Sequence, residues 1–115
     1  MDVVISSVVI DCADPLALAP FWREVLAYEV VDASQEWVLL DDPDGVGVSV
    51  GLQKVPESKV VKNRVHMDLS AEDEEASALR IQAMGATRLW VSDDPDDPFV
   101  VLADPEGNEF CVVRE

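Results

Sequence analysis

The sequence predicts an α+β protein built from two tandem βαβββ modules. Two observations predict it. A β-branched stretch, a helical stretch and three short strand-like stretches follow one another, and this order occurs twice along 115 residues. The segments also align: residues 7–14 (SVVIDCAD) match 66–73 (HMDLSAED), and the turn DPDG at 42–45 recurs as DPEG at 104–107. One copy is too small to bury its own sheet, so we expect the two to share a single domain, residues 1–115.

The first module is expected to span about residues 1–55. Val3 to Cys12 is β-branched and apolar, which predicts a strand. Asp14 before Pro15 is a helix start, and an apolar stripe continues to about Ala27. Three strands should follow at 28–31, 36–40 and 46–55, separated by turn residues.

The second module is expected to span about residues 64–115, after a polar linker at 56–63. A strand is predicted at 64–69. Ser70, with Asp73 three residues later, should cap a helix over 71–84, and Gly85 should stop it. The remaining strands are predicted at 88–91, 99–102 and 109–113.

The composition excludes several classes of partner. The formal charge is −16, from 24 acidic and 8 basic residues, which argues against nucleic acid and against anionic membrane surfaces. No apolar run approaches the roughly 20 residues of a membrane span, and no signal peptide is recognisable, so we expect a cytoplasmic protein. Half of the basic residues cluster at Lys54, Lys59, Lys62 and Arg64. The cluster either recruits an acidic ligand or, more simply, offsets acids across an interface.

Several motifs carry a family resemblance over essentially the whole chain. They are the opening strand ending in ADP, FWREVLA, KNRVHMDL, MGA and the closing ADPEGNEFCVV. Together they resemble the vicinal oxygen chelate superfamily of glyoxalase I, bleomycin-resistance proteins and extradiol dioxygenases, in particular its small glyoxalase-like branch. One departure is Ala27, where the family usually has glycine.

The resemblance implies a half-barrel of two cupped mixed sheets, with the helices outside and a metal-binding cavity within. Carried onto this chain, the family's metal positions fall on Ser7 and His66 in the first strand of each module. In the last strands they fall on Cys111, with Glu109 on the same face, and on Ser49, with Gln53 as the alternative.

This set suits a hard divalent ion poorly, because Mg²⁺ and Mn²⁺ favour carboxylate and imidazole ligands. Zinc would accept His66 and Cys111, and also Glu109 if it reached the ion. Glu109 and Cys111 are two positions apart on a strand, about 6.5–7 Å, so joint chelation would need a bulge. We therefore expect no cofactor. A divalent ion (Zn, Mn, Fe or Ni) is the less favoured alternative.

His66, the one histidine, is the leading candidate for a catalytic residue. Alternation along the strand puts Arg64, His66 and Asp68 on one face, and Val65, Met67 and Leu69 against the helices. His66 would act as a general base or hydrogen-bond a ligand, and Asp68 would hold it or pair with Arg64. Asp11 lies on the same face of its strand as Ser7 and points either into the pocket or to solvent.

For the other candidates a structural role is favoured. Cys111 is expected to be a buried small side chain, and Cys12 a core residue. The aromatic residues Phe21, Trp22 and Trp37 are expected in the core, while Trp90 is expected to be more open and to lie at a pocket mouth.

Two functions follow from the resemblance. One is a glyoxalase-like enzyme, a lyase, isomerase or dioxygenase, that acts on a small organic molecule through His66, with Glu109, Gln53, Ser7 and Asp68 beside it. The other is a metal-free protein that sequesters a small molecule, as bleomycin-resistance proteins do. Family members of this length commonly form homodimers, and we expect the same here.

Overall fold

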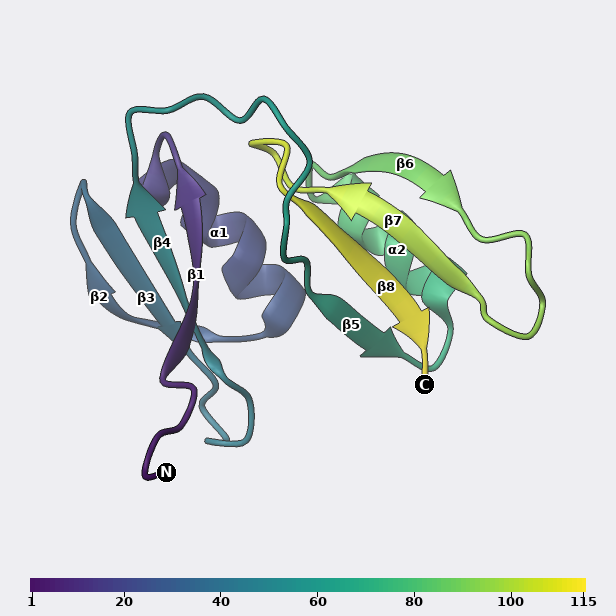
Figure 1. Ribbon diagram of the computed structural model, residues 1–115, viewed down its shortest axis with the longest axis horizontal. Helices are drawn as coiled ribbons and strands as arrows, with labels where there is room; N and C mark the ends of the chain where they lie inside the picture. The colour runs from purple at the N-terminus through teal and green to yellow at the C-terminus, as the bar shows by residue number, and fades with distance from the viewer. The chain divides into compact units, whose positions relative to one another are not determined.

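All 115 residues are described by the computed structural model, and they form two compact units, Met1–Ser58 and Lys59–Glu115. The first unit contains five elements, drawn in purple to teal in Figure 1: β1 (Ser7–Cys12), α1 (Pro15–Leu26), β2 (Glu29–Ala33), β3 (Trp37–Asp41) and β4 (Ser49–Lys54). The second has the same order: β5 (Asp68–Ala71), α2 (Glu74–Ala83), β6 (Thr87–Val91), β7 (Phe99–Ala103) and β8 (Glu109–Arg114). The prediction of two tandem βαβββ modules is confirmed.

The two sheets have one topology. The strand orders are β1-β4-β3-β2 and β5-β8-β7-β6, in which the first pair is parallel and the other pairs are antiparallel. Even the irregularities match, because the register shifts in β2, between Val30 and Asp32, and in β6, between Arg88 and Trp90. Each unit is therefore a mixed four-stranded sheet of α+β class.

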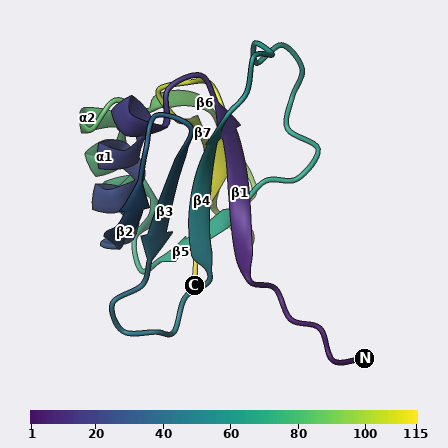
Figure 2. The ribbon, with the colours of Figure 1, turned by 90° about the vertical axis from the view of Figure 1, so that its left-hand side faces the viewer.

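Each helix covers one face of its own sheet. Figure 2 shows α1 against the first sheet, where it packs on β2, β3 and β4. The core of each unit lies between helix and sheet. In the first unit it contains Leu18, Trp22, Val38, Leu40 and Leu52, and in the second Ala78, Ile81, Val100, Leu102, Phe110 and Val112. Since side chains alternate along a strand, the intervening residues lie on the face opposite the helix.

Both helices begin at an aspartate. The Asp14 side chain accepts a hydrogen bond from the Ala17 amide at 3.2 Å, and Asp73 does the same for Ala76 at 3.0 Å. The predicted start of the second helix at Ser70 is thus wrong, because Ser70 belongs to β5, whose pairing with β8 continues to Ala71. The predicted stop at Gly85 is confirmed by its φ of 120°.

The strand predicted at 64–69 begins only at Asp68, so Arg64, His66 and Met67 lie before it. Val65, expected to pack against a helix, is 80% exposed. The physical reason is a competing set of hydrogen bonds: Asn63 bonds to Glu109, which draws the chain out of the parallel ladder. The first strand likewise starts at Ser7 rather than Val3, and β4 at Ser49 rather than Val46.

Candidate functional site

His66 and Asp68 lie together in the second unit. The imidazole Nε2 is 3.2 Å from Asp68 Oδ1, and the two side chains are 42% and 56% exposed. A carboxylate at Nε2 favours the tautomer that carries its proton there, which leaves Nδ1 with a free lone pair. Of the two partners considered for Asp68, the structure shows His66. Arg64 forms no ion pair with Asp68.

Cys111 is the third member of the cluster. The alternation of β8 places Phe110 and Val112 in the core and leaves Cys111 on the face opposite α2, directly beside Asp68 in the parallel register. The ligand atoms of His66, Asp68 and Cys111 all lie within 4.8 Å of one another. Three polar groups thus converge on one face of the second sheet.

The Cys111 thiol is held in its neutral form. Burial raises its pKa most, and the charge of Asp68 and a hydrogen bond from the thiol to that carboxylate raise it further. The charge of Lys62 acts in the opposite direction and is the smallest of these effects. At neutral pH Cys111 is therefore a hydrogen-bond donor to Asp68 and not a thiolate nucleophile.

Glu109 has different partners. Its carboxylate is 2.8 Å from Lys59 Nζ and accepts a hydrogen bond from the Asn63 amide at 2.9 Å. Burial alone would raise the pKa of Glu109, but the hydrogen bonds from Lys59 and Asn63 and the charge of Lys59 outweigh it, so the pKa is lowered. The group of side chains that could hold an ion therefore contains Asp68, and not Glu109 as considered from the sequence.

In the first unit, the candidates lie on the face of the sheet opposite α1. The register pairs Ser7 with Ser49 and Asp11 with Gln53, so the four side chains form two neighbouring pairs. The Ser49 hydroxyl donates a hydrogen bond to Asp41 at 2.6 Å. Hydroxyl, amide and carboxylate groups of this kind can hydrogen-bond a polar ligand, but they are weak ligands for a metal.

Trp37 is a residue of this face that the sequence reasoning assigned to the core. Phe21 and Trp22 are buried as expected, but Trp37 is half-buried and its ring lies directly over Gly51, where a side chain would collide with the indole. The signal was Gly51 itself, because glycine inside a strand often marks a close approach by another group.

The capping aspartates align Val9 with Asp68 and Ser7 with His66 in the two units. Since Val9 pairs with Gly51 and Asp68 pairs with Cys111, Gly51 is the counterpart of Cys111. At this equivalent position the first unit has Gly51 covered by the Trp37 indole, and the second unit has the Cys111 thiol.

The donor set decides which ion would fit. His66, Asp68 and Cys111 offer one nitrogen, one oxygen and one sulfur atom, which suits zinc once the thiol has lost its proton. They do not suit Mn²⁺ or Mg²⁺, which favour several oxygen ligands. Glu109, the nearest additional carboxylate on β8, is taken by Lys59 and Asn63.

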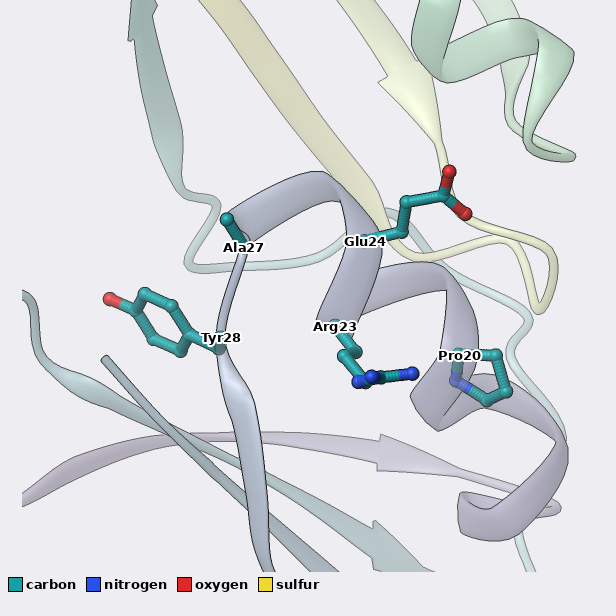
Figure 3. Close-up of a pocket in the computed structure, with 5 residues that line it drawn as sticks. All are labelled: Pro20, Arg23, Glu24, Ala27 and Tyr28. Atoms are coloured by element: carbon teal, nitrogen blue, oxygen red, sulfur yellow. The ribbon is translucent and has the colours of Figure 1, made fainter. Parts of the chain in front are cut away.

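Figure 3 shows an open hollow at the end of α1, lined by Pro20, Arg23, Glu24, Ala27 and Tyr28. It contains none of the expected site residues. The Tyr28 hydroxyl donates a hydrogen bond to the Val48 carbonyl at 3.1 Å and so stabilises the loop before β4 in the first unit. The convergent polar groups, and not this hollow, mark the candidate site.

The described helices are too short or too polar to cross a membrane. Within the basic cluster, Lys59 forms an ion pair, while Lys54, Lys62 and Arg64 form none.

A family model described as a glyoxalase-like domain matches residues 7–113. The chain belongs to this glyoxalase-like family. The predicted membership of the vicinal oxygen chelate superfamily is thereby confirmed. Among curated proteins, no significant match was found.

Solved structures of glyoxalase-like proteins share the fold over nearly the full chain. A glyoxalase/bleomycin resistance protein/dioxygenase family enzyme from Burkholderia phytofirmans is 20% identical, with a TM-score of 0.78 over 97% of this chain and 98% of that one. The bleomycin-binding protein of Streptomyces verticillus, complexed with copper(II)-bleomycin, is 14% identical, with a TM-score of 0.70 over 100% and 98%.

A mutant fosfomycin resistance protein, FosX from Listeria monocytogenes, was solved with Mn(II) and 1S,2S-dihydroxypropylphosphonic acid. It is 14% identical, with a TM-score of 0.79 over 98% of this chain and 90% of that one. The glyoxalase-like fold thus hosts both enzymes and binding proteins, and at these identities the likeness concerns the fold.

Proposed function

We propose that this glyoxalase-like protein binds a small organic molecule at His66 and moves a proton on it, as a lyase or isomerase would. The observation that carries the proposal is the His66–Asp68 pair beside the neutral Cys111 thiol. His66 is accessible, with 42% of its side chain exposed, so a ligand can reach the imidazole.

The residues divide the chemistry among them. With the Nε2 proton directed at Asp68, the free Nδ1 lone pair accepts a proton from a carbon or hydroxyl of the bound molecule, and returns it to a neighbouring atom. Asp68 keeps the ring oriented and stabilises the imidazolium formed in between. Cys111, held neutral, fixes the Asp68 carboxylate from its other side by donating a hydrogen bond.

A second candidate function is sequestration of a small molecule without turnover. The observation that favours it is Trp37, whose half-buried indole lies over Gly51 next to Gln53 in the first unit. A half-buried indole beside the Gln53 amide, with Asp11 on the next strand, can stack on a planar ligand and hydrogen-bond its edge. The bleomycin-binding relative shows that a protein of this fold can serve by binding.

The proposed chemistry needs no metal ion. If zinc were bound, His66, Asp68 and Cys111 would hold it, and it would supply Lewis acidity to a ligand oxygen. The first measurement is the metal content of protein purified without chelator, with thermal-shift titrations of Zn²⁺, Mn²⁺, Fe²⁺ and Ni²⁺. About one zinc per chain, lost in His66→Ala, would overturn the metal-free proposal.

A homodimer is part of the same proposal, and it rests on what the family resemblance implies. The cytoplasmic location expected from the sequence is proposed with it. Sedimentation velocity tests the dimer directly. A single species with the mass of one 12.6 kDa chain at micromolar concentration would contradict it.

The decisive experiment compares wild type, His66→Ala and Ser70→Ala, an exposed control in the adjoining strand β5. A library of small carbonyl compounds, organic acids and aromatic metabolites is screened by thermal shift, and the binders are followed for chemical change by NMR. Turnover that is lost in His66→Ala with binding and folding retained supports the acid–base function. Binding without turnover in wild type supports sequestration. Unchanged binding and turnover in His66→Ala would remove His66 from the site.

A further inference from the structure

The segment leading to His66 has no helix or strand of its own, yet it is fastened to the start of β8. Lys59 Nζ lies 2.8 Å from Glu109 Oε1 and 3.1 Å from Oε2, and it also donates to the Val61 carbonyl. The Asn63 amide donates to Glu109 Oε1 at 2.9 Å, and its side chain donates to the Glu109 carbonyl at 3.4 Å. Glu109 thus binds two residues of the segment, Lys59 and Asn63.

These contacts form one of two anchors on either side of His66. The other is the hydrogen bond from the Cys111 amide to the Met67 carbonyl at 2.9 Å, just before β5 begins. Between the anchors, residues 64–66 have no ladder to fix them. The position of His66 therefore depends on both anchors.

The Glu109 carboxylate is largely shielded from water, and its partner Lys59 is partly shielded. Side-chain exposure is 10% for Glu109 and 26% for Lys59, so the pair is screened less than a surface ion pair. Removing one partner would leave the other charge partly buried without compensation, which is costly. The anchor should therefore be firm.

We propose that Glu109 is a positioning residue, which clamps Lys59 and Asn63 and thereby holds the Lys59–Met67 segment, with His66, against β8. The proposal deepens the proposed function, since His66 matters as the proton-transfer group, but the clamp is tested without any ligand. It also gives Glu109 a role other than metal binding, because the Lys59 ammonium occupies its carboxylate.

The test uses Glu109→Gln and Lys59→Met, with Glu72→Gln as a control that makes the same charge change at an exposed residue. Amide hydrogen exchange is measured along the chain. We expect exchange at the Asn63 and Cys111 amides, which are the donors of the two anchors, to become at least about tenfold faster in both clamp variants, with β7 unchanged and the control like wild type. Lys59→Arg, which keeps the charge, should restore protection.

A second readout is the pH profile of Cys111 alkylation, followed peptide by peptide. Release of the segment admits water to the thiol, and burial is the largest cause of its raised pKa, so the midpoint should fall toward the ordinary value. The double variant Glu109→Gln/Lys59→Met should add nothing to either single change, because all three open one contact.

Exchange and alkylation midpoints that match Glu72→Gln would overturn the clamp. If Lys59→Met fails to fold, Glu109→Gln alone decides, since its amide keeps the shape of the side chain. A positive clamp result together with an unaffected His66→Ala protein would sink the proposed function and leave the clamp standing.

Discussion

Asp68 is the side chain on which the candidate site depends, because it serves two partners at once. Its carboxylate lies 3.2 Å from His66 Nε2 and accepts the hydrogen bond of the Cys111 thiol. A single charge therefore orients the imidazole and keeps the thiol protonated. Loss of the Asp68 charge should therefore affect both His66 and Cys111.

Asp68→Asn should lower the pKa of the Cys111 thiol, because it removes a negative charge that opposes thiolate formation. Alkylation of Cys111 by iodoacetamide should become several-fold faster at pH 8, with Ser70→Ala unchanged. The two cysteines are separated by peptide mass spectrometry, and Cys12 serves as an internal reference. Equal Cys111 rates in wild type and Asp68→Asn would contradict the assigned hydrogen bond.

Glu109 should make the protein more sensitive to acid. Its pKa in the folded chain is lowered from the ordinary value of 4.5, so its stabilising contribution is present above that value. The contribution is lost as the pH falls through the folded pKa, since the unfolded chain then binds more protons. Urea unfolding at several pH values between about 6 and 3 should show a smaller decline in Glu109→Gln than in wild type. Parallel declines would argue against the clamp.

Three residues named from the sequence lie close together in the structure, but several of the contacts around them were not predicted. The family resemblance named His66 and Cys111, and the alternation expected around His66 added Asp68. The pairing of Glu109 with Lys59 and Asn63 was not predictable, because these residues are distant in the sequence and no periodicity relates them. Trp37 was misplaced in the core, although Gly51 gave a signal for its position.

At the scale of elements, α1 ends in an unusual way. Ala27 adopts φ 56° and ψ 39°, the left-handed conformation that glycine accepts readily and an L-residue with a Cβ does not. Its amide closes the helix by donating to the Glu24 carbonyl. The position is the one at which the family resemblance led us to expect glycine.

Ala27→Gly should therefore stabilise the protein by about 0.5–1 kcal/mol, the strain released minus the added entropy of the unfolded chain. Thermal unfolding should show a Tm raised by a few degrees. The matched control is Ala83→Gly at the end of α2, where the backbone is helical and the same exchange should destabilise. A lower Tm for Ala27→Gly would show that the strain is smaller than the entropic cost.

The order of elements was predictable, but several of their limits were not. The Asp14-Pro15 start and Gly85 are local features, and both were placed correctly. The alternation expected over 64–69 failed at Val65, which is exposed. Strand β5 is shorter than predicted because Asn63 bonds to Glu109, a contact that only the folded chain makes. The local sequence pattern cannot predict a distant side chain that takes the place of a strand partner.

At the scale of the whole molecule, charge is the dominant property. Four ion pairs, one of them through His66, engage few of the 24 acidic residues, and the formal charge is −16. Like charges on a folded surface repel one another more than in the expanded chain, so folding works against this field.

Added salt should raise the stability of the protein. Between ionic strengths of about 0.01 M and 0.15 M the Debye length falls from about 30 Å to about 8 Å, which screens most of the repulsion between exposed acids. We expect Tm to rise through this range in sodium chloride and to level off above it, as measured by circular dichroism. A Tm that falls with salt would mean that attractive pairs outweigh the net repulsion.

The correspondence between Gly51 and Cys111 has a consequence for the history of the chain. Two units with one topology and one pattern of register shifts are what a gene duplication leaves behind. In one copy an indole fills the place over a glycine, and in the other a thiol, a carboxylate and an imidazole meet at the equivalent place. The two copies have thus diverged at equivalent positions: Ser7→His together with Val9→Asp would place an imidazole and a carboxylate in the first unit at the positions that His66 and Asp68 hold in the second.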